Sequence, residues 1–205
     1  MSVLISLVKS FSSTSVFDRI QEDFVAINKT LQKQGLPAHM ETVDSGEENL
    51  KFPEVCWRYS SIHYLRYLAA KFIENPLWVP DKASANKSKI PARLCKQICE
   101  EKQSHLICHS DFDGYYLPID FELIIFDREV GVCLGSSVQL HKELEDLAKK
   151  LNLDLGDYTP DLEELFKVRE REFKKDFLGT HKWLLLCLYN IATASILYES
   201  AIRFT

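Results

Sequence analysis

The sequence is poor in the residues that interrupt a fold, with only seven glycines and seven prolines among 205 residues. This scarcity excludes collagen-like and low-complexity chains. The chain also lacks an excess of positive charge, because 25 basic residues face 30 acidic ones and the net charge is −5. We therefore expect no contact with nucleic acid, since proteins that bind phosphate backbones usually carry a basic excess.

Long apolar runs and a secretory leader are missing as well. The first residues carry no basic segment before the apolar stretch, and the apolar run from 183 to 191 is closed by polar side chains. A membrane-spanning helix needs about 20 predominantly apolar residues. We expect no membrane partner and a cytoplasmic location.

The 46% hydrophobic content is enough for a chain of this length to bury a core without disulfides or metal. We expect a single domain over 1–205, with a flexible loop near 80–90, where small and lysine residues follow one another. None of the six cysteines forms a CxxC pair, and most have apolar neighbours. This pattern predicts reduced, buried thiols.

Helical periodicity dominates the chain. Apolar residues recur every three or four positions, and caps or breakers bound each stretch. One predicted helix is capped by Ser136, with Gln139 at capping-box spacing. The predicted helices cover approximately 15–34, 60–74, 91–98, 138–151, 160–177 and 181–202.

The segment 105–126 has a different period. Asp113 and Gly114 stand between alternating apolar residues, which is typical of a two-residue β-hairpin turn. We therefore predict an α+β fold, with about six helices packed on a small, mainly antiparallel sheet that contains this 105–126 hairpin.

The predicted hairpin supplies the candidate catalytic residues. Its register puts His109, Asp111 and Asp120 on one face, where an imidazole beside carboxylates could act as a general acid or base or bind a divalent metal. The competing interpretation is structural, with Asp113 and Gly114 forming the turn and His109 a cross-strand neighbour. No complete zinc or calcium motif is present, so we predict no metal and no cofactor.

Two further groups are candidate binding residues. Gly135, Ser136 and Ser137 precede a predicted helix, whose N-terminus could hold an anion; helix capping alone also explains the serines. Tyr64, Tyr67 and Arg66 belong to a helix in a tyrosine-rich segment and suit a protein partner. The alternative for the tyrosines is a half-buried rim of the core.

No complete catalytic motif occurs in the chain. We expect a non-enzymatic binding protein that sequesters or neutralises a protein partner, in the manner of an immunity protein, with its acidic surface meeting a basic partner. The alternative is a small hydrolase or metal-dependent enzyme that uses His109, Asp111 and Asp120. The sequence predicts no oligomeric state.

Overall fold

The computed structural model describes residues 2–10, 14–41, 52–110, 114–127 and 132–204. The strands are β1 (Ser2–Leu7), β2 (Val55–Arg58), β3 (Tyr115–Leu117), β4 (Ile125–Asp127), β5 (Val132–Ser136) and β6 (Ile202–Phe204). The helices are α1 (Thr14–Lys33), α2 (Tyr59–Glu74), α3 (Ala92–Gln97), α4 (His105–Cys108), α5 (Ser137–Lys150), α6 (Leu162–Lys175) and α7 (Gly179–Leu197). Short turns of other helix types are η1 (Val8–Ser10), η2 (Ser84–Asn86) and η3 (Ile98–Lys102).

The described strands form one sheet in the order β2-β1-β6-β3-β5-β4. The pairs β1–β2, β1–β6, β3–β6 and β4–β5 are antiparallel, and β3–β5 is parallel. The α+β class and the mainly antiparallel sheet are therefore confirmed. The N-terminal and C-terminal strands lie beside each other in the middle of this sheet.

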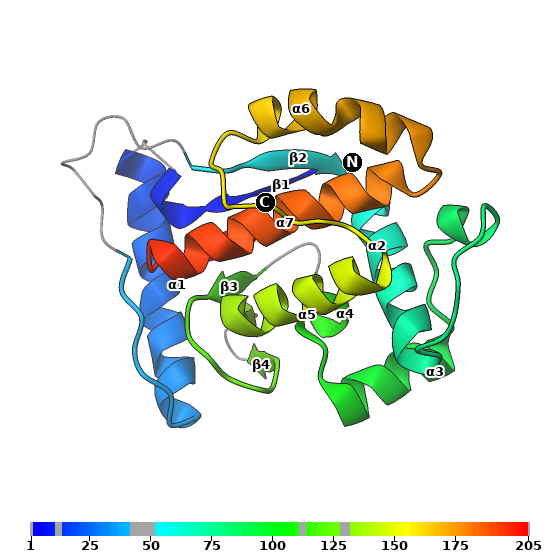
Figure 1. The fold of residues 1–205 in the computed structure, drawn as a ribbon. Helices are drawn as coiled ribbons and strands as arrows, with labels where there is room; N and C mark the ends of the chain where they lie inside the picture. The colour runs from blue at the N-terminus through cyan, green and yellow to red at the C-terminus, as the bar shows by residue number, and fades with distance from the viewer. Residues whose placement is uncertain (1, 11–13, 42–51, 111–113, 128–131, 205) are drawn as a thin grey trace.

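Helices cover both faces of the sheet (Figure 1). Alternation along β3 separates the two cores, because Tyr115 packs with the apolar stripe of α1 whereas Tyr116 packs on the opposite side. That opposite side is filled by α2, α4, α5 and α7. Helix α7 has buried residues around most of its circumference and packs against α2, α5, α6 and the sheet, so it is the central helix of the fold.

Local signals located the main helices well. Ser136 accepts a hydrogen bond from the backbone N–H of Gln139 at 3.2 Å, so the predicted cap of α5 is confirmed. Helix α6 begins after Asp161, whose carboxylate accepts from the N–H of Glu164 at 2.9 Å, so this helix starts two residues later than predicted. The bond at Ser136 needs nothing from the rest of the fold, which is why the sequence pattern predicts it.

The predicted 105–126 hairpin is wrong. Its first arm is the helix α4, and β3, its second arm, pairs with β5 and β6 instead. Asp113 lies outside the described residues, whereas Gly114 has a φ of 131°, in the region that favours glycine. The apolar residues of 105–108 are buried by helical packing, which a short apolar run does not distinguish from strand burial.

The lysine-rich segment 80–90 contains the helical turn η2. Asp81 and Ser84 bind each other through side chains and backbone, and Ser84 and Ala85 are buried. The flexibility of this loop and the single-domain organisation stay predictions.

Candidate functional site

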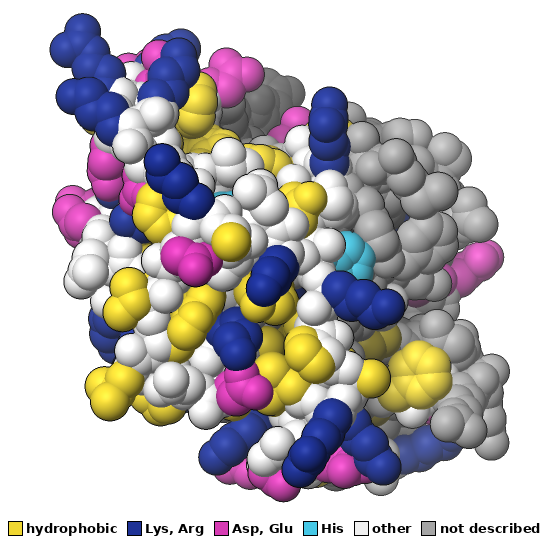
Figure 2. Space-filling model, turned by 90° about the vertical axis from the view of Figure 1, so that its right-hand side faces the viewer, with side chains coloured by type: hydrophobic (Ala, Val, Ile, Leu, Met, Phe, Trp, Pro, Cys, Tyr) yellow, Lys and Arg dark blue, Asp and Glu magenta, His cyan; other side chains and the backbone are white. Residues whose placement is uncertain are grey.

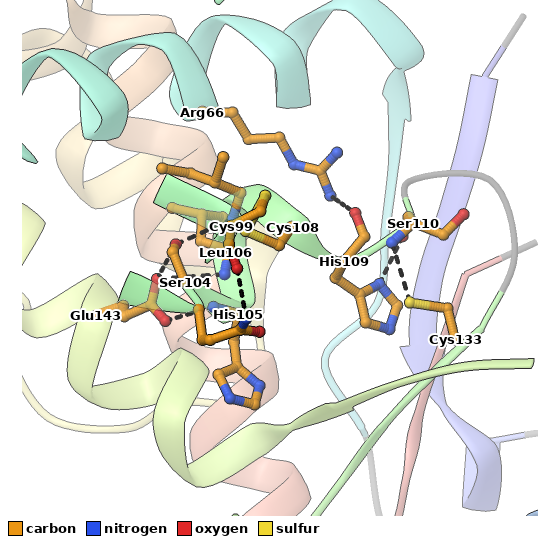
Figure 3. The surroundings of a disulfide bond; sticks show 12 residues. Arg66, Cys99, Ser104, His105, Leu106, Cys108, His109, Ser110, Cys133 and Glu143 are labelled. Atoms are coloured by element: carbon orange, nitrogen blue, oxygen red, sulfur yellow. Dashed lines mark hydrogen bonds between the residues drawn. A yellow bond between two sulfur atoms is a disulfide. The ribbon is translucent and has the colours of Figure 1, made fainter. Parts of the chain in front are cut away.

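Helix α4 is held by a carboxylate from another helix (Figure 3). Glu143 of α5 accepts hydrogen bonds from Ser104 Oγ and the N–H of His105, each at 2.6 Å, and from the N–H of Leu106 at 3.2 Å. Ser104 Oγ in turn accepts from the N–H of Ile107 at 3.1 Å. Burial raises the pKa of Glu143 above its ordinary value, against the lowering effect of these bonds.

His105 joins α4 to the start of α5. Its Nδ1 accepts from the N–H of Ser136 at 2.8 Å, so Nε2 carries the proton and donates to the carbonyl of Glu122 at 3.1 Å. Burial lowers the pKa of His105. The imidazole therefore acts as a neutral structural bridge.

His109 is 2% exposed and stacks on Tyr116 with ring centroids 4.0 Å apart. Its Nδ1 lies 2.5 Å from the carbonyl oxygen of Ser110, and its Nε2 lies 3.1 Å from that of Tyr115. Burial, aided by the nearby charge of Arg66, lowers the pKa of His109 to about 4. We call Ser104, His105, His109, Ser136 and Glu143 the histidine hub.

The structure places two of the proposed catalytic residues, His109 and Asp120, in different surroundings. His109 is enclosed in the hub, whereas Asp120 is exposed and accepts from Gln139 Nε2 at 2.5 Å and Lys142 Nζ at 3.3 Å. The negative charge of Asp120 partly opposes the lowering of the pKa of His105 by burial, and it is not among the causes that shift the pKa of His109. Asp111 lies outside the described residues. Across the described ranges, no group of three or more His, Cys, Asp or Glu could hold a metal ion.

The proposed anion-binding residues are buried in the fold. A Cβ on Gly135 would lie 2.5 Å from the Tyr116 ring, so the glycine permits close packing. Ser136 Oγ donates to the carbonyl of Ile119 at 2.7 Å, and Ser137 Oγ shares a hydrogen bond with Ser195 Oγ. Their polar atoms serve internal contacts of the fold.

The proposed partner-binding residues are mostly interior. Arg66 is 5% exposed and donates through Nη2 to the carbonyl of His109 at 2.9 Å (Figure 3). Tyr67 is 7% exposed, and the half-buried Tyr64 packs against the ring of His181. The guanidinium of Arg66 therefore holds the backbone of His109, a residue of the hub.

The pairing of the cysteines differs from the prediction of reduced thiols. Cys99 and Cys108 form a disulfide that joins η3 to α4, with Cα atoms 5.7 Å apart, so the prediction of six reduced thiols is wrong. Of the free cysteines, Cys133 and Cys187 are buried, but Cys56 is exposed. The helical turns that bring Cys99 and Cys108 together are not visible in cysteine spacing alone.

A hollowed surface lies between the edge strand β2 and α6, and we call it the β2–α6 groove. It consists of two hollows of about 410 and 440 Å³ that share Phe166 and Trp183. The apolar residues along it are Val55, Trp57, Leu162, Phe166, Phe173 and Trp183. No sequence pattern indicates this groove, because more than 100 residues separate its two sides.

Two carboxylates at one end of the groove are unpaired. Glu54 and Glu163 line the smaller hollow, both are exposed, and neither forms an ion pair or side-chain hydrogen bond with any described residue. Lys167, which lines the same hollow, is paired with Glu164 at 3.5 Å. The mouth of this hollow therefore has an excess of negative charge.

Charge is also unequal along the chain. Residues 55–110 contain nine lysines and arginines and four acidic residues, whereas 111–164 contains fourteen acidic and four basic residues. The first stretch includes α2 and α3, and the face in Figure 2 carries scattered Lys and Arg side chains. The second includes α5 and the approach to α6, on the near side of the molecule in Figure 1.

Comparisons with known proteins extend this picture. Neither the curated proteins nor the solved structures contain a match to the chain. A search of the described residues finds no helix that is both long and apolar enough to cross a membrane.

A family model, described as "Putative DNA-mimic protein", matches residues 1–204. This match overturns the expectation that nucleic acid has no bearing on the partners of the protein, and it agrees with a protein as the partner. The net charge of −5, which argued against binding to a phosphate backbone, is compatible with this family description. Because the match covers almost the whole length, the chain belongs to this DNA-mimic family.

Proposed function

We propose that this protein binds a DNA-binding protein and neutralises it, by presenting carboxylates where the partner would meet DNA phosphates. Membership of the DNA-mimic family is the observation that carries this proposal. Duplex DNA has one negative charge for about every 1.7 Å of its axis, and the proteins that bind it neutralise its phosphates with lysine and arginine. A surface rich in carboxylates competes for those side chains.

The acidic side of the molecule is the candidate surface. Glu122 and Asp157 are exposed, and their carboxylates have no ion-pair partner within the described ranges. Both belong to the acidic stretch 111–164. The rival idea of a hydrolase or metal enzyme has no support from the comparisons or from the surroundings of His109.

The test is competition with DNA. The immobilised protein captures proteins from nuclease-treated extract of the source organism, and the column is washed with duplex DNA or, separately, with neutral dextran. We expect a captured protein that duplex DNA releases, that dextran leaves bound, and that binds a DNA fragment when purified.

Charge-reversal variants locate the surface. Glu122→Lys combined with Asp157→Lys should weaken binding of the captured protein at least tenfold. Glu22→Lys, an exposed position on α1, is the matched control and should change binding less than twofold. Capture of proteins that DNA never displaces, or equal weakening by the control, would contradict the proposal.

A further inference from the structure

We propose that the β2–α6 groove binds an arginine side chain from a basic segment of the protein partner. The inference rests on the proposed function, because it names the part of a DNA-binding partner that this surface recognises. It adds a specific anchor to a contact that overall negative charge would otherwise make unspecific.

Aromatic rings form the walls of the groove. The rings of Phe166 and Trp183 have centroids 5.0 Å apart, and the ring of Phe173 is 5.8 Å from that of Trp183. Trp57 faces the same space from β2. Rings that are open to solvent attract a cation through their negative faces, and tryptophan does so most strongly.

The molecule already contains such a contact beside the groove. The guanidinium carbon of Arg169 lies 5.2 Å from the centroid of Phe173 on α6. Arg169 also pairs with Glu172 at 3.0 Å, so a ring and a carboxylate together hold this guanidinium. Phe166 and Glu163, three residues apart and about two helical turns earlier on α6, offer the same combination to an incoming side chain.

The unpaired carboxylates determine that the ligand carries a positive charge. Glu54 and Glu163 come from opposite sides of the smaller hollow, from the residue before β2 and from α6. Neither has a cationic partner among the described residues, so a positive group that enters there gains two favourable contacts at no internal loss. Lys174, at the other hollow, is already paired with Glu170 at 2.7 Å.

Arginine fits this lining better than lysine. A guanidinium is planar, weakly hydrated and stacks on rings, whereas an ammonium group is strongly hydrated and loses more on entering an apolar hollow. The smaller hollow, about 410 Å³, has room for one such side chain and its neighbours in an extended segment. DNA-binding proteins carry arginines to contact phosphates and base edges, so the partner class supplies this side chain.

The experiment uses the full chain and three labelled nonapeptides, in which arginine, lysine or citrulline alternates with glycine. Binding is measured by fluorescence anisotropy at low salt. We expect the arginine peptide to bind at least fivefold more tightly than the lysine peptide. Citrulline has a similar shape without the charge, and that peptide should show no binding.

Two alterations of the groove test the site. Glu54→Gln combined with Glu163→Gln should weaken the arginine peptide at least tenfold, whereas the control Glu22→Gln should leave it within twofold. Alkylation of the exposed Cys56, which also lines the smaller hollow, should block binding without a change in any core residue. Circular dichroism verifies that each variant is folded.

Equal binding of the arginine and lysine peptides, or no effect of the groove variant, would overturn the inference. A dimer in sedimentation experiments that the groove variant dissociates would do the same, because a second copy would then occupy the groove. If the groove variant still competes with DNA for the captured partner, the proposed function survives and only the arginine anchor fails. If neither variant set affects a captured partner, both fail.

Discussion

The histidine hub and the β2–α6 groove differ in how they use ionisable groups. In the hub, the carboxylate of Glu143 and both imidazoles are committed to backbone partners inside the fold. In the groove, Glu54 and Glu163 are exposed and have no partner in the described part of the chain. Histidines that cluster in a sequence can therefore have a structural role inside the fold, whereas surface glutamates with no unusual sequence context can be available for binding.

The largest expected effect comes from the hub carboxylate. Glu143→Ala should lower the free energy of unfolding by about 3 kcal/mol, because it leaves two buried backbone N–H groups and a hydroxyl without their acceptor. Chemical denaturation measures the change. Glu163→Ala in the groove is the matched control and should cost less than about 0.5 kcal/mol; equal losses would erase the distinction between the two regions.

The disulfide beside the hub should have the next largest effect. Reduction, or Cys99→Ser with Cys108→Ser, should cost about 2.5 kcal/mol, as the loop-closure model gives for a separation of nine residues. Thermal unfolding with and without a reductant measures it. Cys56→Ser, in the groove, should leave the unfolding temperature unchanged, and an indifferent response to reductant would contradict the prediction.

Acid should destabilise the hub through protonation of His109. The pKa of His109 is about 4 in the folded protein and near 6.5 when unfolded, so the unfolded state takes up the proton first. The free energy of unfolding should therefore contain the full contribution of the neutral His109 above pH 6.5 and should decrease as the pH falls toward 4. The expected decrease between pH 7 and pH 5 is about 2 kcal/mol.

Urea denaturation at pH 7 and pH 5 tests this dependence. His109→Gln should be less stable at pH 7 but should lose less on acidification than the wild type does. His141→Gln is the control, because His141 is only half-buried and its pKa is lowered less strongly. A wild-type stability that rises between pH 7 and 5 would contradict the assigned direction.

The smallest effect on stability should come from modification of the groove itself. A maleimide should label Cys56 within minutes in the native protein, whereas the buried Cys133 and Cys187 should react only after unfolding. Burial also raises the pKa of the Cys187 thiol, which slows its reaction further. Mass spectrometry of the labelled peptides, with unfolded protein as the reference, distinguishes these sites.

Local chemistry made much of the fold predictable. The cap at Ser136, the periodicity of α5 and the apolar run of α7 depend on neighbours in the sequence, and the structure confirms them. The strand prediction for residues 105–108 rests on the apolar alternation before Asp113 and Gly114. The helix that forms there is capped by Ser104 and is also held by the carboxylate of Glu143, 38 residues away from His105. No local pattern contains such a contact.

The candidate site was less predictable than the fold. His109 was selected for its chemistry, but burial suppresses its charge. The groove unites Trp57 with Phe166 and Trp183, and only the tertiary arrangement brings these rings together. Its acidic mouth consists of glutamates that, read singly, are indistinguishable from solvated surface residues.

The central place of β6 has a consequence for how the chain reaches its native state. Ile5 pairs with Phe204, and β6 is the only described strand that connects the β1–β2 pair to β3, β4 and β5. Until residues 202–204 insert, the two halves of the sheet each expose an unpaired edge. Sheet completion is thus a late, long-range step, and a chain interrupted before Ile202 should be prone to aggregate through those edges.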